Sequence, residues 1–283
     1  MTTTRELVGG LDLHGSPSGT HQRDERVSDR RGDPPVWRSR WLAVAGELVL
    51  VAIAALLYSL VRGLTDDRVE AAVTNAERVI DLERRLGIFV EPDLQAWALG
   101  SDVVVNLANA VYIAYWPLVI GTLVWLLVTR PGAYPLFRSA LLASGGLSLV
   151  VFALFPLAPP RFMPEYGFAD TIAARSDGYR EFAASALVNE YAAMPSLHFG
   201  WVLLAAIAIG SLVRSPWLRV GAASLPVLML ASIVLTGNHY IVDAIVGGAI
   251  VIGGLGIALL LRRRIPHASP RPMSANHLIR PPT

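Results

Sequence analysis

Residues 239–261 read HYIVDAIVGGAIVIGGLGIALLL and are followed directly by three arginines at 262–264. The stretch is apolar apart from its first turns, and about 20 apolar residues are enough to cross the hydrocarbon core of a bilayer. Its glycine pairs are typical of membrane helices that approach one another closely. The stretch is therefore predicted to be a membrane-spanning helix with the arginines at its cytoplasmic end.

The composition of the whole chain favours the same fold class. Of its 283 residues, 53% are hydrophobic and 16% are charged, against about 25% charged residues in a typical soluble domain. The apolar residues gather in six blocks, and a span is predicted in each: residues 41–61, 103–128, 136–158, 194–213, 219–236 and 239–261. The predicted fold class is an all-α, polytopic membrane protein. Because cysteine is absent, disulfides and a thiol nucleophile are excluded.

Polar segments flank the predicted membrane domain, which comprises residues 41–262. Residues 1–40 are rich in Gly, Pro, Ser, Asp and Arg, and residues 263–283 are rich in Pro and Arg. Neither segment can bury an apolar core, so both are predicted to be disordered tails. The N-terminal segment is too long and too polar for the start of a signal peptide, so the first span is expected to be an uncleaved anchor.

The distribution of arginine predicts the orientation. All 24 basic residues are Arg, and with the N-terminus inside, 16 of them lie on the inner side and eight on the outer side. The positive-inside rule favours this arrangement. We therefore predict a multi-pass plasma-membrane protein with both termini in the cytoplasm. The loops at 62–102, 159–193 and 237–238 then face outside.

Residues 66–86 are predicted to form an outer-face amphipathic helix rather than a span. Apolar residues recur there at helical spacing between charged ones. Two readings stay open: a helix that lies on the outer membrane surface, or a soluble helix beside the membrane. The segment Gly87-Ile-Phe-Val-Glu-Pro92 that follows is expected to end the helix and return the chain to the membrane.

Two of the six histidines, His198 and His239, lie in hydrophobic sequence at the predicted outer ends of spans. Asp243 follows His239 by four residues, which on a helix places the carboxylate one turn below the imidazole. An acid within a span costs about 2.5–3.5 kcal/mol, and a histidine partner lowers that cost. The carboxylate would fix the tautomer of the ring and raise the basicity of its other nitrogen. A histidine that acts as a nucleophile or a general base needs this fixed tautomer and this raised basicity.

Arg161 lies where the third span leaves the membrane, on the same predicted side. A guanidinium is suited to clamping phosphate through its planar fork of donors, and the start of the sixth span adds free backbone N–H groups. Taken singly, each histidine can be explained as an interfacial residue and Arg161 as a lipid-headgroup anchor. Together, on one side of the membrane, they predict a site for a phosphate group.

A polar stripe in the second span has two interpretations. Its members recur three to four residues apart: Asn106, Asn109, Tyr112 and Tyr115. They either form hydrogen bonds between helices or line one wall of the site.

Two segments resemble motifs of the type 2 phosphatidic acid phosphatase (PAP2) superfamily. Pro195-Ser-Leu-His198 resembles the motif Pro-Ser-Gly-His, with Leu197 in place of Gly. Residues 232–243 resemble the motif Ser-Arg-x5-His-x3-Asp, with Ile233 in place of Arg. The third motif of the superfamily, Lys-x6-Arg-Pro, is matched by Arg161 but has Leu154 at the Lys position.

These departures resemble one branch, the inositolphosphotransferase family of fungal inositol phosphorylceramide synthases and their actinobacterial relatives. The segments that carry this resemblance are residues 87–92, 159–161, 191–198 and 236–243. The resemblance covers about residues 45–262 and implies a metal-independent, cofactor-free phosphoryl transfer in two steps.

By this resemblance, His239 attacks phosphorus and becomes a phosphohistidine, and Asp243 orients it. His198 protonates the leaving alcohol and then activates the acceptor, while Arg161 and Ser196 hold the phosphate oxygens. Because the Lys and one Arg of the superfamily motifs are missing here, other basic residues must supply their positive charge. Arg175 and Arg180 from the same outer loop are candidates for that role, and the further site candidates are Tyr191 and Asn238.

Three functions stay open at this point. The first is a lipid-phosphate phosphatase with water as acceptor, and the second is a transferase that moves a head group from a lipid to an alcohol, as an inositolphosphotransferase does. The third is a non-catalytic membrane scaffold or transporter. The partners expected are a membrane lipid phosphate and water or an alcohol, with no nucleic acid. A CDP-alcohol phosphotransferase is excluded because it needs several Asp residues in one span, and no predicted span has more than one.

Overall fold

The computed structural model describes residues 68–171 and 191–264, together with scattered helical positions between residues 46 and 60. Within these residues the regular elements are helices, and the extended pairing is a single bridge between Leu157 and Ala192. The predicted all-α class is confirmed. Residues 1–48 and 49–283 are separate compact units, and all contacts given below belong to the second. The predicted tails lie almost wholly outside the described residues.

Four stretches are long and apolar enough to cross a membrane. They are Asp102–Thr129 (α4 and α5 together), α6 (Tyr134–Leu154), α9 (Pro216–Leu235) and α10 (Ile241–Arg264). They account for four of the six predicted spans. The fourth predicted span corresponds to α8 (Leu197–Leu212), whose 16 residues reach only about 24 Å. Most of the first predicted span, 41–61, lies outside the described residues.

The second predicted span is interrupted, which the sequence pattern did not indicate. α4 (Asp102–Ile113) and α5 (Tyr115–Thr129) meet at Ala114. Pro117 has no N–H to donate, and its ring crowds the carbonyl of Ile113 four residues earlier. The break lies between Tyr112 and Tyr115, which both contact the site described below.

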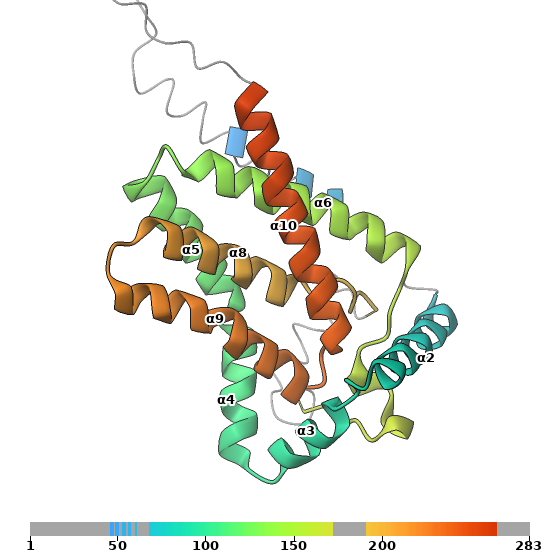
Figure 1. Ribbon diagram of the computed structural model, residues 1–283. Helices are drawn as coiled ribbons and strands as arrows, with labels where there is room; N and C mark the ends of the chain where they lie inside the picture. The colour runs from blue at the N-terminus through green and yellow to red at the C-terminus, as the bar shows by residue number, and fades with distance from the viewer. Residues whose placement is uncertain are drawn as a thin grey trace, which may run out of the picture. The chain divides into compact units, whose positions relative to one another are not determined.

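α10 is central to the packing of the transmembrane helices. It packs on α6 and α8, while α8 also packs on α9, and α9 on α4 (Figure 1). One buried cluster joins Leu126, Phe137, Leu204 and Val251 from α5, α6, α8 and α10. Large apolar side chains on the outer faces stay exposed, as expected of helices that contact lipid tails rather than water.

The predicted amphipathic helix exists as α2 (Val69–Leu86), but it packs on the protein itself. Its buried residues Ala72, Ala76 and Ile80 pack in one cluster with Leu157 and Met163. These last two belong to the loop after α6, where η1 (Pro160–Phe162) and η2 (Pro164–Tyr166) lie. This side of α2 is therefore covered by the protein, while Val69, Leu82 and Leu86 of the same helix stay exposed. α3 (Glu91–Leu99) follows directly.

Candidate active site

Three segments that are distant in sequence are joined by backbone hydrogen bonds. In the loop after α6, the Leu157 N–H donates to the Tyr191 carbonyl at 2.8 Å, and the Ala193 N–H donates to the Leu157 carbonyl at 3.2 Å. Further along the loop, the Arg161 N–H donates to the Gly237 carbonyl at 2.8 Å. The segments that precede α8 and α10 are thus both attached to the loop that carries Arg161.

His239 lies in a non-helical segment, two residues before α10 begins at Ile241. It is only 5% exposed, and its Nδ1 lies 2.8 Å from the Ala193 carbonyl oxygen and 3.5 Å from Asp243 Oδ2. Because a carbonyl oxygen only accepts, these partners assign the proton to Nδ1. The lone pair is then on Nε2, the nitrogen that a nucleophile or base must present.

Asp243 reaches His239 by a different route from the one predicted. The predicted pairing one turn apart on a helix is wrong because residues 239 and 240 are not helical. Instead, the fully buried Asp243 lies in the first turn of α10, and its Oδ2 accepts from the Tyr240 N–H at 3.0 Å. The carboxylate thus reaches back from the third residue of its helix to the N–H before the helix, as in a capping box, and faces the ring that precedes it.

His198 lies in the first turn of α8 and faces His239. Its Nδ1 is 3.4 Å from His239 Nε2. The ring is stacked on Tyr112, with centroids 4.2 Å apart at 18°, and is tilted against Tyr115 at 4.3 Å. Two members of the predicted polar stripe thus line a wall beside His198, whereas Asn106 is exposed.

Close contact between α8 and α10 brings the two histidines together. A Cβ atom at Gly247 would lie 2.2 Å from the Ser196 carbonyl oxygen, and one at Gly200 would lie 2.8 Å from the Gly247 carbonyl oxygen. The Ser196 N–H donates to the Asp243 carbonyl at 3.0 Å. Ser196 is also the N-cap of α8, since its Oγ accepts from the Phe199 N–H at 3.4 Å.

Arg161 lies beside the segment that carries His239. Its guanidinium donates to Asn238 Oδ1, and its Nε is 3.6 Å from Asp170 Oδ2. Asn238 is held by a second bond, from its Nδ2 to Thr236 Oγ1 at 2.7 Å. The contact with Asp170 was missed by the sequence analysis, because nothing in the local pattern distinguishes this Asp from other loop acids.

The remaining candidates have separate outcomes. Tyr191 supplies its carbonyl to the pairing of the loops, and its ring contacts Phe162 at 5.8 Å between centroids. Arg175 and Arg180 lie outside the described residues. Within the described part of the chain, no three His, Asp or Glu side chains are grouped as metal ligands.

Comparison with known proteins identifies the family. The sequence profile of the PAP2 superfamily matches residues 77–257, which include every described site residue discussed above. Neither the curated proteins nor the solved structures give a match. The profile confirms the predicted superfamily, while the inositolphosphotransferase branch stays a prediction. The chain belongs to the PAP2 superfamily.

Proposed function

We propose that the protein is a lipid-phosphate phosphatase or phosphotransferase that acts through a phosphohistidine at His239. Members of the superfamily are generally phosphatases or phosphotransferases, and the specific part of our proposal is the phosphohistidine at His239. One observation carries it: the hydrogen bond from His239 Nδ1 to the Ala193 carbonyl, beside Asp243, leaves Nε2 unprotonated and facing His198. This is the arrangement of an activated nucleophile paired with an acid–base group.

The first step forms the phosphohistidine. His239 Nε2 attacks phosphorus, the bond from phosphorus to the lipid oxygen breaks, and protonated His198 gives its proton to that oxygen. The carboxylate of Asp243 stabilises the positive charge that develops on the His239 ring. Because His198 Nδ1 lies only 3.4 Å from His239 Nε2, binding of the phosphoryl group between them requires the two rings to separate.

The second step returns the enzyme to its starting state. His198, now neutral, takes a proton from water or an alcohol, whose oxygen attacks phosphorus as the P–N bond breaks. Water gives inorganic phosphate, and an alcohol gives a new phosphate ester. The same site therefore serves a phosphatase or a transferase, and the acceptor decides between them.

The phosphate oxygens are bound by Arg161 and Ser196 in this proposal. The Arg161 guanidinium, now on Asn238 and Asp170, can turn to a phosphate with two parallel N–H bonds. The Ser196 hydroxyl accepts from a backbone N–H, so its own proton is available for a phosphate oxygen. Since the site lies among apolar helices, the substrate is a membrane lipid phosphate. The excess of arginine on the predicted inner side supports a site that faces the outside of the plasma membrane.

The proposal is tested by phosphate release from detergent-purified protein in EDTA. The substrates are phosphatidate, a prenyl diphosphate and a phosphorylated lipid-linked sugar, each assayed with His239→Ala and with His277→Ala as a histidine control. We expect release by the parent protein and His277→Ala, and none by His239→Ala. An acid-labile, alkali-stable phosphate on the protein identifies the intermediate.

An alcohol acceptor then distinguishes the two reactions. Inositol or a ceramide added to the assay diverts phosphate or head group into a new ester if the protein is a transferase, as its branch resemblance predicts. Equal turnover by His239→Ala and the parent protein would exclude the phosphohistidine. No reaction with any donor and acceptor, in folded protein, would support the non-catalytic scaffold or transporter.

A further inference from the structure

Two buried glutamates from outside the membrane-spanning helices contact α10, the helix that follows the proposed nucleophile. Glu83 belongs to α2 and Glu91 opens α3, and neither is exposed to solvent. Glu83 Oε1 accepts from the Val242 N–H at 2.8 Å, and Glu91 Oε1 accepts from the Ile241 N–H at 3.0 Å. The first N–H groups of a helix have no partner within the helix. These two side chains therefore complete the first turn of α10.

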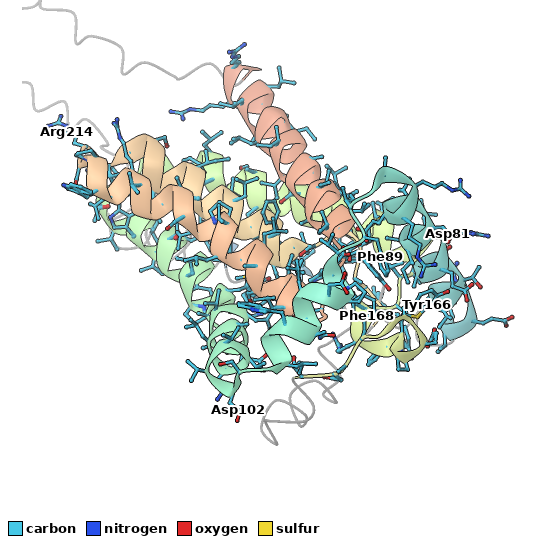
Figure 2. All side chains as sticks on the ribbon, turned by 60° about the horizontal axis from the view of Figure 1, so that its bottom comes forward. Asp81, Phe89, Asp102, Tyr166, Phe168 and Arg214 are labelled. Atoms are coloured by element: carbon cyan, nitrogen blue, oxygen red, sulfur yellow. The ribbon has the colours of Figure 1, made fainter. Side chains whose placement is uncertain are left out.

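The turn between α2 and α3 returns Glu91 to the side of Glu83. Gly87 ends α2 with φ of 70°, and the next N–H, of Ile88, donates to the Glu83 carbonyl at 2.9 Å. The Phe89 ring then packs edge-on against Phe168, with centroids 6.1 Å apart. Figure 2 shows Phe89, Phe168 and Tyr166 gathered beside α2. The segment at residues 87–92, so far without a role, thus positions one of the two acids.

The two carboxyl groups lie beside each other, because they accept from the N–H groups of the adjacent residues Ile241 and Val242. Their Oε2 atoms are buried and have no hydrogen-bond partner within the described residues. An ionised carboxylate only accepts, so a hydrogen bond between two carboxyl groups requires a proton on one of them. One proton on the pair would provide such a bond and, with the other group ionised, leave a single negative charge near the positive end of the α10 dipole.

The surroundings of Glu83 favour its protonated form. The charged groups that act on it are Glu91 of α3 and Asp243 of α10, both acidic. The buried Tyr240 hydroxyl lies in the same group of side chains and senses Glu165 of η2 as well. Burial and these neighbouring acids raise the pKa of Glu83 to about 9. At neutral pH the pair is thus expected to keep its proton.

We propose that Glu83 and Glu91 are positioning residues that share one proton and thereby hold the first turn of α10 where His239 reacts. His239 precedes this turn by two residues, and Asp243 lies within it. Displacement of the turn therefore moves the nucleophile and its carboxylate relative to His198. This inference rests on the proposed function for the role of His239, and it adds α2 and α3 to the machinery that orients the site.

Amide substitutions distinguish a shared proton from a merely structural contact. Glu83→Gln and Glu91→Gln each keep an acceptor for the α10 backbone and place an NH2 donor against the remaining carboxylate, so each single variant is expected to retain most of the turnover at pH 7. The double variant sets two NH2 groups against each other and is expected to lose about 10- to 100-fold in kcat, the size of loss that a small misplacement causes. Glu83→Ala is expected to lose a similar factor. An exposed acid of the same helix provides the control, Glu77→Gln.

The pH profile gives a second readout that a structural role would not change. In the parent protein kcat is expected to fall above about pH 9, as Glu83 releases the proton. Glu83→Gln cannot release it and is expected to lose this alkaline limb, while Glu77→Gln keeps it. A double Gln variant as active as the singles, or an unchanged alkaline limb in Glu83→Gln, would overturn the proposal.

A measurement without substrate separates this inference from the proposed function. Hydrogen exchange of the peptide covering residues 238–246 reports whether the first turn of α10 opens. We expect exchange, after correction for its intrinsic pH dependence, to increase above pH 9 in the parent protein and at pH 7 in the double Gln variant. If His239→Ala turns over normally while exchange behaves in this way, the proposed function fails and the holding of the turn by a shared proton stands. Unchanged exchange in both cases overturns the inference.

Discussion

The close contact between α8 and α10 makes Gly247→Ala a direct test of the site geometry. The added Cβ atom would lie 2.2 Å from the Ser196 carbonyl oxygen, whereas ordinary contacts begin at 3.4 Å. This oxygen belongs to the backbone, so the start of α8 must retreat by about 1.2 Å, the difference between these distances. His198 lies two residues from Ser196 and therefore moves away from His239.

The expected effect on turnover follows from that displacement. A misplacement of about 1 Å costs on the order of 100-fold in rate, so kcat for phosphate release is expected to fall by roughly this factor. Overpacking costs about 1–3 kcal/mol, and alanine regains about 0.5–1 kcal/mol over glycine within a helix. A net loss of about 1–2 kcal/mol lowers the thermal midpoint by about 2–8 °C for a domain of this size.

The same helix offers a matched control. Gly253→Ala adds a Cβ atom with nothing within 4 Å, so turnover is expected to be unchanged and the thermal midpoint equal or slightly higher. Both variants are assayed for phosphate release and for thermal unfolding in the same detergent. Full activity and an unchanged midpoint in Gly247→Ala would refute the argument from close approach. Equal losses in both variants would instead assign the effect to helix flexibility.

Three further predictions concern other parts of the site. Arg161→Lys keeps the charge but loses the planar fork that can bind phosphate bidentately. We expect kcat/KM to fall about 10- to 100-fold, because a hydrogen bond to a charged group contributes about 1.5–3 kcal/mol. Unchanged steady-state kinetics would exclude Arg161 from phosphate binding. Tyr112→Leu removes the ring stacked on His198 and is expected to lower kcat about 2- to 10-fold, which corresponds to the free energy of an aromatic pair. Tyr112→Phe keeps the ring and is expected to retain more of the activity. Equal losses in the two variants would show that the hydroxyl matters rather than the ring. The third prediction concerns the pH dependence of stability. Folding raises the pKa of Glu83 from 4.5 to about 9, so between these pH values the folded chain keeps a proton that the unfolded chain releases. The free energy of unfolding is therefore expected to fall as pH rises through this range, by up to about 1.4 kcal/mol per pH unit. Thermal midpoints between pH 5 and 9 are expected to show this slope in the parent protein and to lose it in Glu83→Gln, and parallel slopes would contradict it.

The transmembrane helices were predictable because hydropathy is a local property. A run of apolar side chains crosses a membrane whatever its neighbours are, so α6, α9 and α10 begin and end within a few residues of their predicted spans. The break between α4 and α5 was not predicted, although Pro117 is its local cause. A proline in a membrane helix can be accommodated by neighbouring groups without a break.

The members of the candidate site were also predictable, whereas their contacts were not. Four ionisable residues stand out in apolar sequence, where they are costly and typically mark a functional site: Arg161, His198, His239 and Asp243. The partner of His239 Nδ1 is a backbone carbonyl, that of Ala193, and every residue has such a carbonyl. The closeness of His239 and Asp243 was expected for an incorrect reason, since a turn before α10 rather than a helix brings them together.

The amino-acid sequence was enough to predict an all-α membrane protein, its superfamily and the few polar residues among its apolar helices. These properties depend on hydropathy and on short motifs, which are read within about twenty residues. The tertiary structure alone decided that Glu83 and Glu91, 159 and 150 residues from their backbone partners, complete the first turn of α10. It also decided that α2 packs on the protein, because burial of a face depends on what the rest of the chain brings against it.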